Sequence, residues 1–232
     1  MARKRTQYKP GDIFGIPCSA RRVAYGQILL DVRRLWRKTD IFDKHPECAL
    51  VGPVCGDGLL VRIFQYKGRK PSIEKFGTME HWPPFLVVDK QLAAGDFPII
   101  GHLPVSADQL DFPEGTCSQD YPDEYYTFDK GGISVRIEMS EEEFHAMGGI
   151  GGANFEIQAS EVVMGIDGKV AVRETGLYFR DLRMSAQRAT FLDRAGLSEN
   201  MSYHEMAVTA AGVLPEEMLH ATEKLFPGST CS

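Results

Sequence analysis

The sequence is poor in the features that mark membrane proteins and disulfide-rich secreted proteins. None of its apolar runs approaches the roughly 20 residues that a membrane-spanning helix needs, so we expect no membrane contact. The basic start, residues 1–5, is not followed by an apolar segment, so we expect no secretory signal and a cytoplasmic location. The cysteines are odd in number and irregularly spaced, which argues against a disulfide framework and for reduced thiols. They are Cys18, Cys48, Cys55, Cys117 and Cys231.

The sequence also lacks a recognisable catalytic or nucleotide-binding motif. It has no Gly-x-Ser-x-Gly turn to carry a nucleophilic serine, and no cysteine can be paired with a histidine. The glycine-rich run 148–152 has Asn154 where the dinucleotide-binding pattern requires its third glycine. His145 and His204 lie near glutamates, but in predicted helices, where such pairs are usually solvated. We therefore expect that the protein is not an enzyme and holds no cofactor.

A small group of potential zinc ligands lies in the first third of the chain. The group is His45, Cys48 and Cys55, with His81 as a possible fourth ligand. Tetrahedral zinc would accept these side chains, but their spacing matches no closed zinc module, and Cys55 lies among turn residues. We expect no metal site.

The charge is distributed unevenly along a chain of otherwise ordinary globular composition. Of the 232 residues, 43% are hydrophobic and 25% are charged, with a net charge of −6. Residues 1–75 hold 16 Lys and Arg against 7 Asp and Glu, whereas the remainder is strongly acidic. This asymmetry indicates either a bipolar surface that steers a partner or charges that neutralise each other within one protein. The basic residues 33–38 and 67–70 resemble a nucleic-acid-binding surface in charge. The signal is weak, because few aromatic residues accompany them.

The start of the chain reads as a tight turn followed by two strands. Pro10 and Gly11 suit a turn, because proline presets φ and glycine tolerates positive φ. Phe14 and Ile16 alternate with Gly15 and a proline, so one face of the first strand is apolar and should point inward. A second strand follows from about residue 24.

These residues resemble the opening of the Immunity protein 26 family of bacterial polymorphic toxin systems. The matching residues are Lys9, Gly11, Asp12, Ile13, Phe14, Ile16, Pro17, Tyr25 and Gly26. The resemblance implies a non-catalytic immunity protein that binds and neutralises a cognate toxin, for which a nuclease is one expected activity. The same opening is similar to that of SH3-type barrels with nucleic-acid-binding or endoribonuclease-like function. That is the alternative, against which the net acidic charge argues.

The remaining pattern predicts an α+β protein. Short strand-like runs at 59–64, 85–88 and 99–103 indicate a curved antiparallel sheet or SH3-like barrel over residues 1–103. An α+β part over 125–232 should contain strands at 125–128, 133–139 and 155–164. It should also contain helices from Ser140 and over 181–195, 202–211 and 215–226.

Between these parts, residues 104–124 are acidic and proline-rich, which predicts a linker or long exposed loop. Aromatic residues among the charges suit the capture of a basic partner, such as the substrate cleft of a nuclease toxin. A solvated linker is the alternative. The candidate partner-binding residues are Asp108, Asp111, Phe112, Glu114, Asp120, Tyr121, Asp123, Glu124 and Tyr125.

Overall fold

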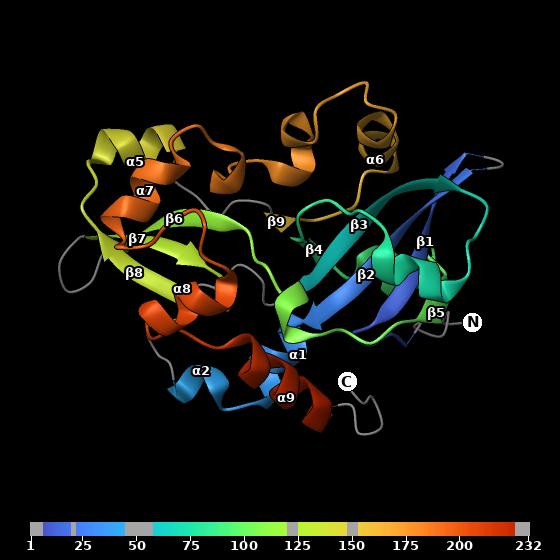
Figure 1. The fold of residues 1–232 in the computed structure, drawn as a ribbon, viewed down its shortest axis with the longest axis horizontal. Coiled ribbons are helices and arrows are strands. Elements are labelled where there is room, and N and C mark those ends of the chain that lie inside the picture. The colour runs from blue at the N-terminus through green and yellow to red at the C-terminus, as the bar shows by residue number, and fades with distance from the viewer. Residues whose placement is uncertain (1–6, 20–21, 45–57, 120–124, 148–152, 226–232) are drawn as a thin grey trace.

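The described residues form two largely antiparallel β-sheets with helices packed around them (Figure 1). A computed structural model describes residues 7–19, 22–44, 58–119, 125–147 and 153–225. Of the predicted features, the run 148–152 and part of the acidic segment lie outside these residues. The α+β class predicted from the sequence is confirmed.

The larger sheet has six strands in the order β5-β1-β2-β3-β4-β9. Its strands are β1 (Asp12–Ser19), β2 (Arg22–Asp31), β3 (Gly58–Gly68), β4 (Phe85–Val88), β5 (Ile99–His102) and β9 (Ala153–Asn154). Neighbours are antiparallel except β4 and β9, which pair in parallel. Register shifts along β1, β2 and β3 bend the strands.

The prediction of an SH3-like barrel is wrong, because the sheet is open. A barrel closes only when its two edge strands pair with each other. Among the described strands, β5 pairs with β1 alone and β9 pairs with β4 alone. The alternative prediction, a curved antiparallel sheet, describes the observed arrangement.

The second sheet contains three strands, β6 (Glu114–Gln119), β7 (Tyr125–Lys130) and β8 (Ile133–Ile137), in that order. Strands β7 and β8 were predicted, but β6 lies where we expected an exposed linker. Leu110 and Phe112, just before β6, are 2% and 0% exposed. These apolar side chains anchor the segment in the core, so residues 110–119 are an internal part of the fold.

Short helices surround both sheets. The α-helices are α1 (Val32–Lys38), α2 (Ile41–Lys44), α4 (Lys90–Ala94), α5 (Glu141–Met147), α6 (Ala159–Ile166), α7 (Arg188–Arg194), α8 (Tyr203–Thr209) and α9 (Pro215–Leu225). The 3-10 turns are η2 (Ile73–Thr78), η3 (Ala107–Gln109), η4 (Val172–Glu174), η5 (Gly176–Tyr178) and η6 (Leu182–Met184). In Figure 1, α1, α2 and α9 gather together, and these three helices contact one another.

The strand predicted over 155–164 is wrong, because α6 occupies the second half of this stretch. Its β-branched residues favour a strand locally. The helix instead buries Val162 completely, and it brings Gly165 close to the indole ring of Trp82. Packing of one helical face against the larger sheet therefore overrides local preference.

The hydrophobic core joins the two halves of the chain. One cluster fills one face of the larger sheet, where Phe14 and Ile16 of β1 are both 0% exposed, as predicted. A second cluster combines Leu29 and Leu60 of the larger sheet with Phe128 of β7 and residues of α8 and α9. The division into parts 1–103 and 125–232 remains a proposal, and these parts share one core.

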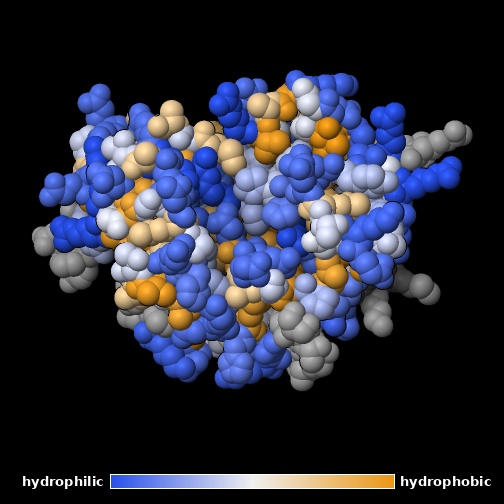
Figure 2. Space-filling view, viewed as in Figure 1, coloured by the Kyte–Doolittle hydropathy of each residue, from blue (hydrophilic) through white to orange (hydrophobic). Residues whose placement is uncertain are grey.

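The surface in Figure 2 is mostly hydrophilic, with apolar groups over the region of α6 and its neighbouring turns. Phe155 and Phe179 are the most exposed large hydrophobic residues described, at 85% and 67%. These rings therefore contribute apolar area to the solvent-facing surface.

The turn before β1 depends on glycine at position 11. Gly11 has a φ of +90°, and a Cβ there would lie 2.5 Å from the ring of His102 and 2.8 Å from the carbonyl oxygen of Leu103. Asp12 stabilises the same turn, because its carboxylate accepts a hydrogen bond from the Lys9 amide at 2.9 Å. Its other oxygen lies 3.0 Å from His102 Nδ1.

We expect Gly11→Val to lower the free energy of unfolding by about 1–3 kcal/mol, because valine is strained at positive φ. Urea denaturation monitored by circular dichroism measures this change. Gly77→Val is the matched control, since a Cβ at Gly77 meets only the Leu103 side chain, at 3.6 Å. A Gly11→Val protein as stable as this control would show that the turn tolerates a side chain.

Candidate functional site: a basic pocket beside helix α1

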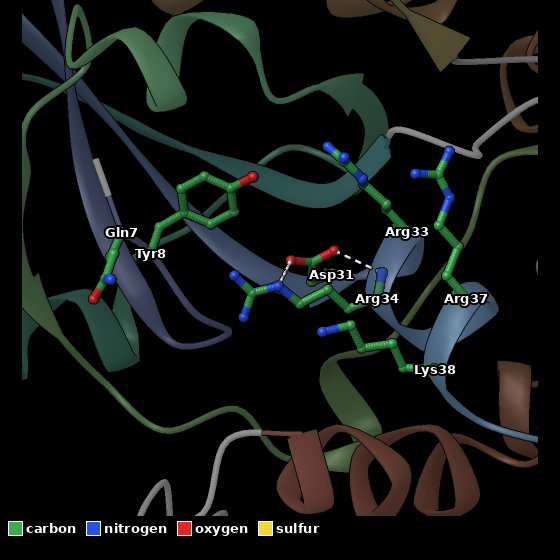
Figure 3. Close-up of a pocket in the computed structure, with 7 residues that line it drawn as sticks. All are labelled: Gln7, Tyr8, Asp31, Arg33, Arg34, Arg37 and Lys38. Atoms are coloured by element: carbon green, nitrogen blue, oxygen red, sulfur yellow. Dashed lines mark hydrogen bonds and ion pairs between the residues drawn. The ribbon is translucent and has the colours of Figure 1, made fainter. Parts of the chain in front are cut away.

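A pocket of about 410 Å³ lies between the segment before β1 and the start of α1 (Figure 3). It is lined by Gln7, Tyr8, Asp31, Arg33, Arg34, Arg37 and Lys38. Four of these seven residues are cationic, and all four come from α1.

The local sequence explains why the cations face the pocket together. Strand β2 ends at Asp31, whose carboxylate caps α1 by accepting a hydrogen bond from the Arg34 amide at 3.0 Å. Val32 and Leu35 are buried on one side of the helix. The helical period then places Arg33 above Arg37, and Arg34 above Lys38, on the remaining surface. Figure 3 shows Arg34 and Lys38 extending toward the side of Tyr8.

The pocket carries more positive than negative charge. Asp31 Oδ2 lies 3.3 Å from Arg34 Nε, and Asp89 lies 3.8 Å from Arg33 and accepts a hydrogen bond from the Tyr8 hydroxyl. Burial raises the pKa of Asp31, even though Arg34 opposes this shift. Among the described residues, two carboxylates lie beside these four cations, so the local potential favours an anionic group from outside.

The predicted acidic surface is largely internal. Phe112 and Glu114 are 0% exposed, so neither can contact a partner. Glu114 accepts hydrogen bonds from Lys130 Nζ at 2.9 Å and from Arg188 Nε at 2.6 Å. Burial acts to raise the pKa of Glu114, but hydrogen bonding to Arg188 and the charge of Lys130 outweigh it and lower the pKa.

Asp111 is also neutralised from within the fold. Its two oxygens lie 2.7 Å from Lys130 Nζ and 2.7 Å from Arg183 Nη1. Burial opposes ionisation, yet these cations hold its pKa below the usual range. The two cations follow Asp111 by 19 and 72 positions in the sequence, so local patterns could not reveal the pairing.

Three predicted partner-binding residues reach the surface, among them the half-buried Asp111. Asp108 is exposed, and Tyr125 is half-buried with the Arg136 guanidinium 4.8 Å from its ring centre. The other four, Asp120, Tyr121, Asp123 and Glu124, lie outside the described residues. Of the five described residues, Phe112 and Glu114 are buried, so these five do not form one exposed patch.

The residues of the opening motif form the turn and the first hairpin. The Tyr25 hydroxyl donates to the Gly68 carbonyl at 3.0 Å, and a Cβ at Gly26 would lie 2.3 Å from the Phe14 ring. Pro17 is exposed, whereas Asp12 is buried in the turn described above. These contacts are structural, so the motif shapes the sheet from which α1 emerges.

The candidate metal and acid–base groups do not assemble into a site among the described residues. Within that part of the chain, no group of three or more His, Cys, Asp or Glu residues could hold a metal ion. His45, Cys48 and Cys55 lie outside it. His145 pairs with Glu141 at 3.3 Å and His204 with Glu216 at 3.1 Å, all on the surface.

The described residues include no helix that is both long enough and apolar enough to span a membrane. The basic pocket itself was only partly foreseen, from the weak nucleic-acid-like charge of residues 33–38. Its signal was the i, i+4 repeat of cations directly after a strand that ends in aspartate.

Comparison with known proteins gives a family match over the N-terminal half of the chain. No curated protein and no solved structure matches the chain. Residues 9–122 match the family described as Immunity protein 26, and this segment contains β1 to β6 and the cations of α1. The chain thus resembles the Immunity protein 26 family over residues 9–122, which supports its assignment as an immunity-type protein.

Proposed function

We propose that this protein binds and neutralises the cognate toxin of a bacterial polymorphic toxin system, without catalysis of its own. The match to Immunity protein 26 over residues 9–122 is the observation that carries the proposal. The matched segment includes the cations of the α1 pocket, which offer a partner a concentrated positive charge.

The sign of this charge decides which part of a toxin it fits. The substrate cleft of a nuclease is basic, so a basic pocket would repel it. The pocket instead complements an acidic surface, which in a nuclease toxin lies outside the substrate cleft. We therefore propose that α1 contacts an acidic surface of the toxin.

We expect the double variant Arg37→Gln, Lys38→Gln to associate with the toxin more slowly than the unmodified protein. Both side chains are exposed in the last turn of α1, and glutamine preserves helix propensity. Since charge steering accelerates encounter, the association rate at low salt should fall about tenfold and its salt dependence should weaken. Binding kinetics with the purified product of the neighbouring toxin gene, at low and high salt, measure both effects.

The matched control is Lys169→Gln with Arg173→Gln, which removes the same charge from exposed positions elsewhere. Equal association rates for both double variants would remove α1 from the interface. Failure of the unmodified protein to bind the toxin would contradict the proposed function itself.

A nucleic acid is the alternative occupant, favoured by the same four cations on α1. In that case an oligonucleotide would bind the unmodified protein, compete at α1 and bind more weakly to the Arg37→Gln, Lys38→Gln variant. This outcome would support the nucleic-acid-binding function that the sequence raised as its second hypothesis.

A further inference from the structure

A second cleft contains a buried arginine that no carboxylate of the described residues neutralises. Arg62 of β3 is only 3% exposed, and it lines a cleft of about 660 Å³. The cleft wall also includes Gln65, Thr78, His81 and three carboxylates, those of Glu80, Asp108 and Asp111. It lies over the face of the larger sheet opposite Phe14 and Ile16.

Hydrogen bonds hold the Arg62 guanidinium in one orientation. Its Nε and Nη2 both donate to Gln27 Oε1, at 3.0 and 2.6 Å. Gln27 is held in turn, because its Nε2 donates to the Leu103 carbonyl at 2.7 Å. The guanidinium also lies 5.3 Å from the centre of the Phe64 ring. One edge of the planar group is therefore occupied, and its position is determined by packing.

The neighbouring edge of the guanidinium, formed by Nη1 and the second N–H of Nη2, is available to a ligand. Nη1 has no hydrogen-bond partner among the described residues. Two side-chain atoms in this part of the chain are both wholly buried and without a hydrogen-bond partner, and they belong to Thr116 and Asp129. Since Nη1 of Arg62 has no partner and is not one of them, it keeps contact with solvent. A carboxylate binds such an edge through two parallel hydrogen bonds.

Among the described residues that line the cleft, Arg62 is the one lysine or arginine, and the exposed carboxylates of Glu80 and Asp108 lie in the same wall. Burial lowers the pKa of Arg62 to about 10, so the side chain stays positively charged at neutral pH. Asp111 is neutralised by Lys130 and Arg183, and none of the ion pairs among the described residues involves Arg62. A buried, unpaired guanidinium is costly, and an incoming carboxylate would compensate it. Asp108, exposed at the rim, compensates the buried charge only in part: its charge raises the pKa of Arg62 against the larger effect of burial, and the two side chains form no ion pair.

We propose that the Arg62 cleft is a carboxylate-binding site and that the toxin supplies the carboxylate. The second part rests on the proposed function, whereas the first does not. An acidic side chain or C-terminus inserted here would meet a preorganised guanidinium, an arrangement typical of interface hot spots.

Two experiments test the two parts separately. Titration of the ¹⁵N-labelled protein with acetate, against chloride at equal ionic strength, follows the side-chain Nε–H resonances. Arg62 should shift in a saturable, acetate-specific way, whereas Arg183, whose hydrogen bonds are made within the fold, should not. Absence of an acetate-specific shift at Arg62 would overturn the carboxylate site, whether or not a toxin binds.

The second experiment measures toxin binding by Arg62→Lys, which keeps the positive charge but loses the pair of parallel N–H donors. We expect the dissociation constant of the complex with the toxin to rise about tenfold. Arg69→Lys, at an exposed position just after β3, is the control and should leave the constant unchanged. Thermal denaturation confirms that both variants are folded. An acetate-specific shift combined with unaltered toxin binding would overturn the toxin as the source and assign the site to a free carboxylate.

Discussion

Replacement of Arg183 by alanine should lower the free energy of unfolding by about 3–5 kcal/mol, because it leaves the buried carboxylate of Asp181 without its cation and removes one of the two cations that hold Asp111. The Arg183 side chain is 7% exposed. Its Nη1 donates to Asp111 at 2.7 Å, and its Nη2 donates to Asp181 at 2.7 Å and to the Pro84 carbonyl at 2.6 Å.

These bonds connect distant parts of the fold. Pro84 immediately precedes β4 of the larger sheet, Asp111 lies before β6 of the second sheet, and Arg183 belongs to η6. Loss of the guanidinium would therefore weaken the contact between the two sheets. It would also leave negative charge on its partner carboxylates without full compensation.

Chemical denaturation of Arg183→Ala and Arg183→Lys measures this effect. Lysine keeps the charge but cannot reproduce the planar set of donors, so we expect intermediate stability. Arg173→Ala, at an exposed position, should change stability by no more than about 0.5 kcal/mol. If Arg183→Ala were as stable as Arg173→Ala, the buried ion pairs would contribute nothing net to folding.

The second large effect concerns pH and the buried carboxyl of Asp129. This residue is 5% exposed, and burial raises its pKa from 3.8 to about 7, although Thr127 and Ser134 oppose the shift. Thr127 Oγ1 donates to Oδ2 at 2.6 Å, whereas Oδ1 has no partner among the described residues.

Between about pH 4 and 7, the folded protein keeps a proton on Asp129 that the unfolded chain has already lost. The free energy of unfolding therefore falls as pH rises through this window, by at most about 4 kcal/mol for this group. Above about pH 7 both states are ionised, and the contribution no longer changes.

Asp129→Asn removes this dependence, so we expect the variant to gain stability over the unmodified protein as pH rises. The difference in unfolding free energy between the two proteins should grow by up to about 4 kcal/mol from pH 4 to pH 8. Taking this difference cancels other carboxylates, including Asp111 and Glu114. Urea denaturation at several pH values provides it, with the exposed Asp193→Asn as control. A difference independent of pH would mean that Asp129 titrates alike in both states.

Local sequence determined the beginnings and the caps of several elements. Alternation predicted that Phe14 and Ile16 point inward, and both are buried. The Ser-x-x-Glu pattern predicted the start of α5, where the Ser140 amide donates to Glu143 at 2.9 Å and the Glu143 amide to Ser140 at 3.1 Å. The positive φ of Gly11 followed from its place after Pro10. These features depend on neighbours a few residues away, so short stretches of sequence are enough to predict them.

Long-range contacts decided the features that the sequence left open or that we predicted wrongly. The acidic segment before β6 reads as a solvated linker, yet Lys130, Arg183 and Arg188 reach it from later elements, bury Glu114 and pair with the half-buried Asp111. The edge strands β5 and β9 do not meet, so a sheet with barrel-like local sequence stays open.

The two candidate sites also differ in how far the sequence alone predicts them. The four cations of the α1 pocket follow from an aspartate cap and the helical repeat, and both are visible in residues 31–38. The Arg62 cleft required the tertiary structure, because Gln27 and Asp108 approach Arg62, and Leu103 holds Gln27, only when the chain folds. Burial of a charge and the identity of its partner depend on residues distant in sequence, which is why only the assembled fold reveals them.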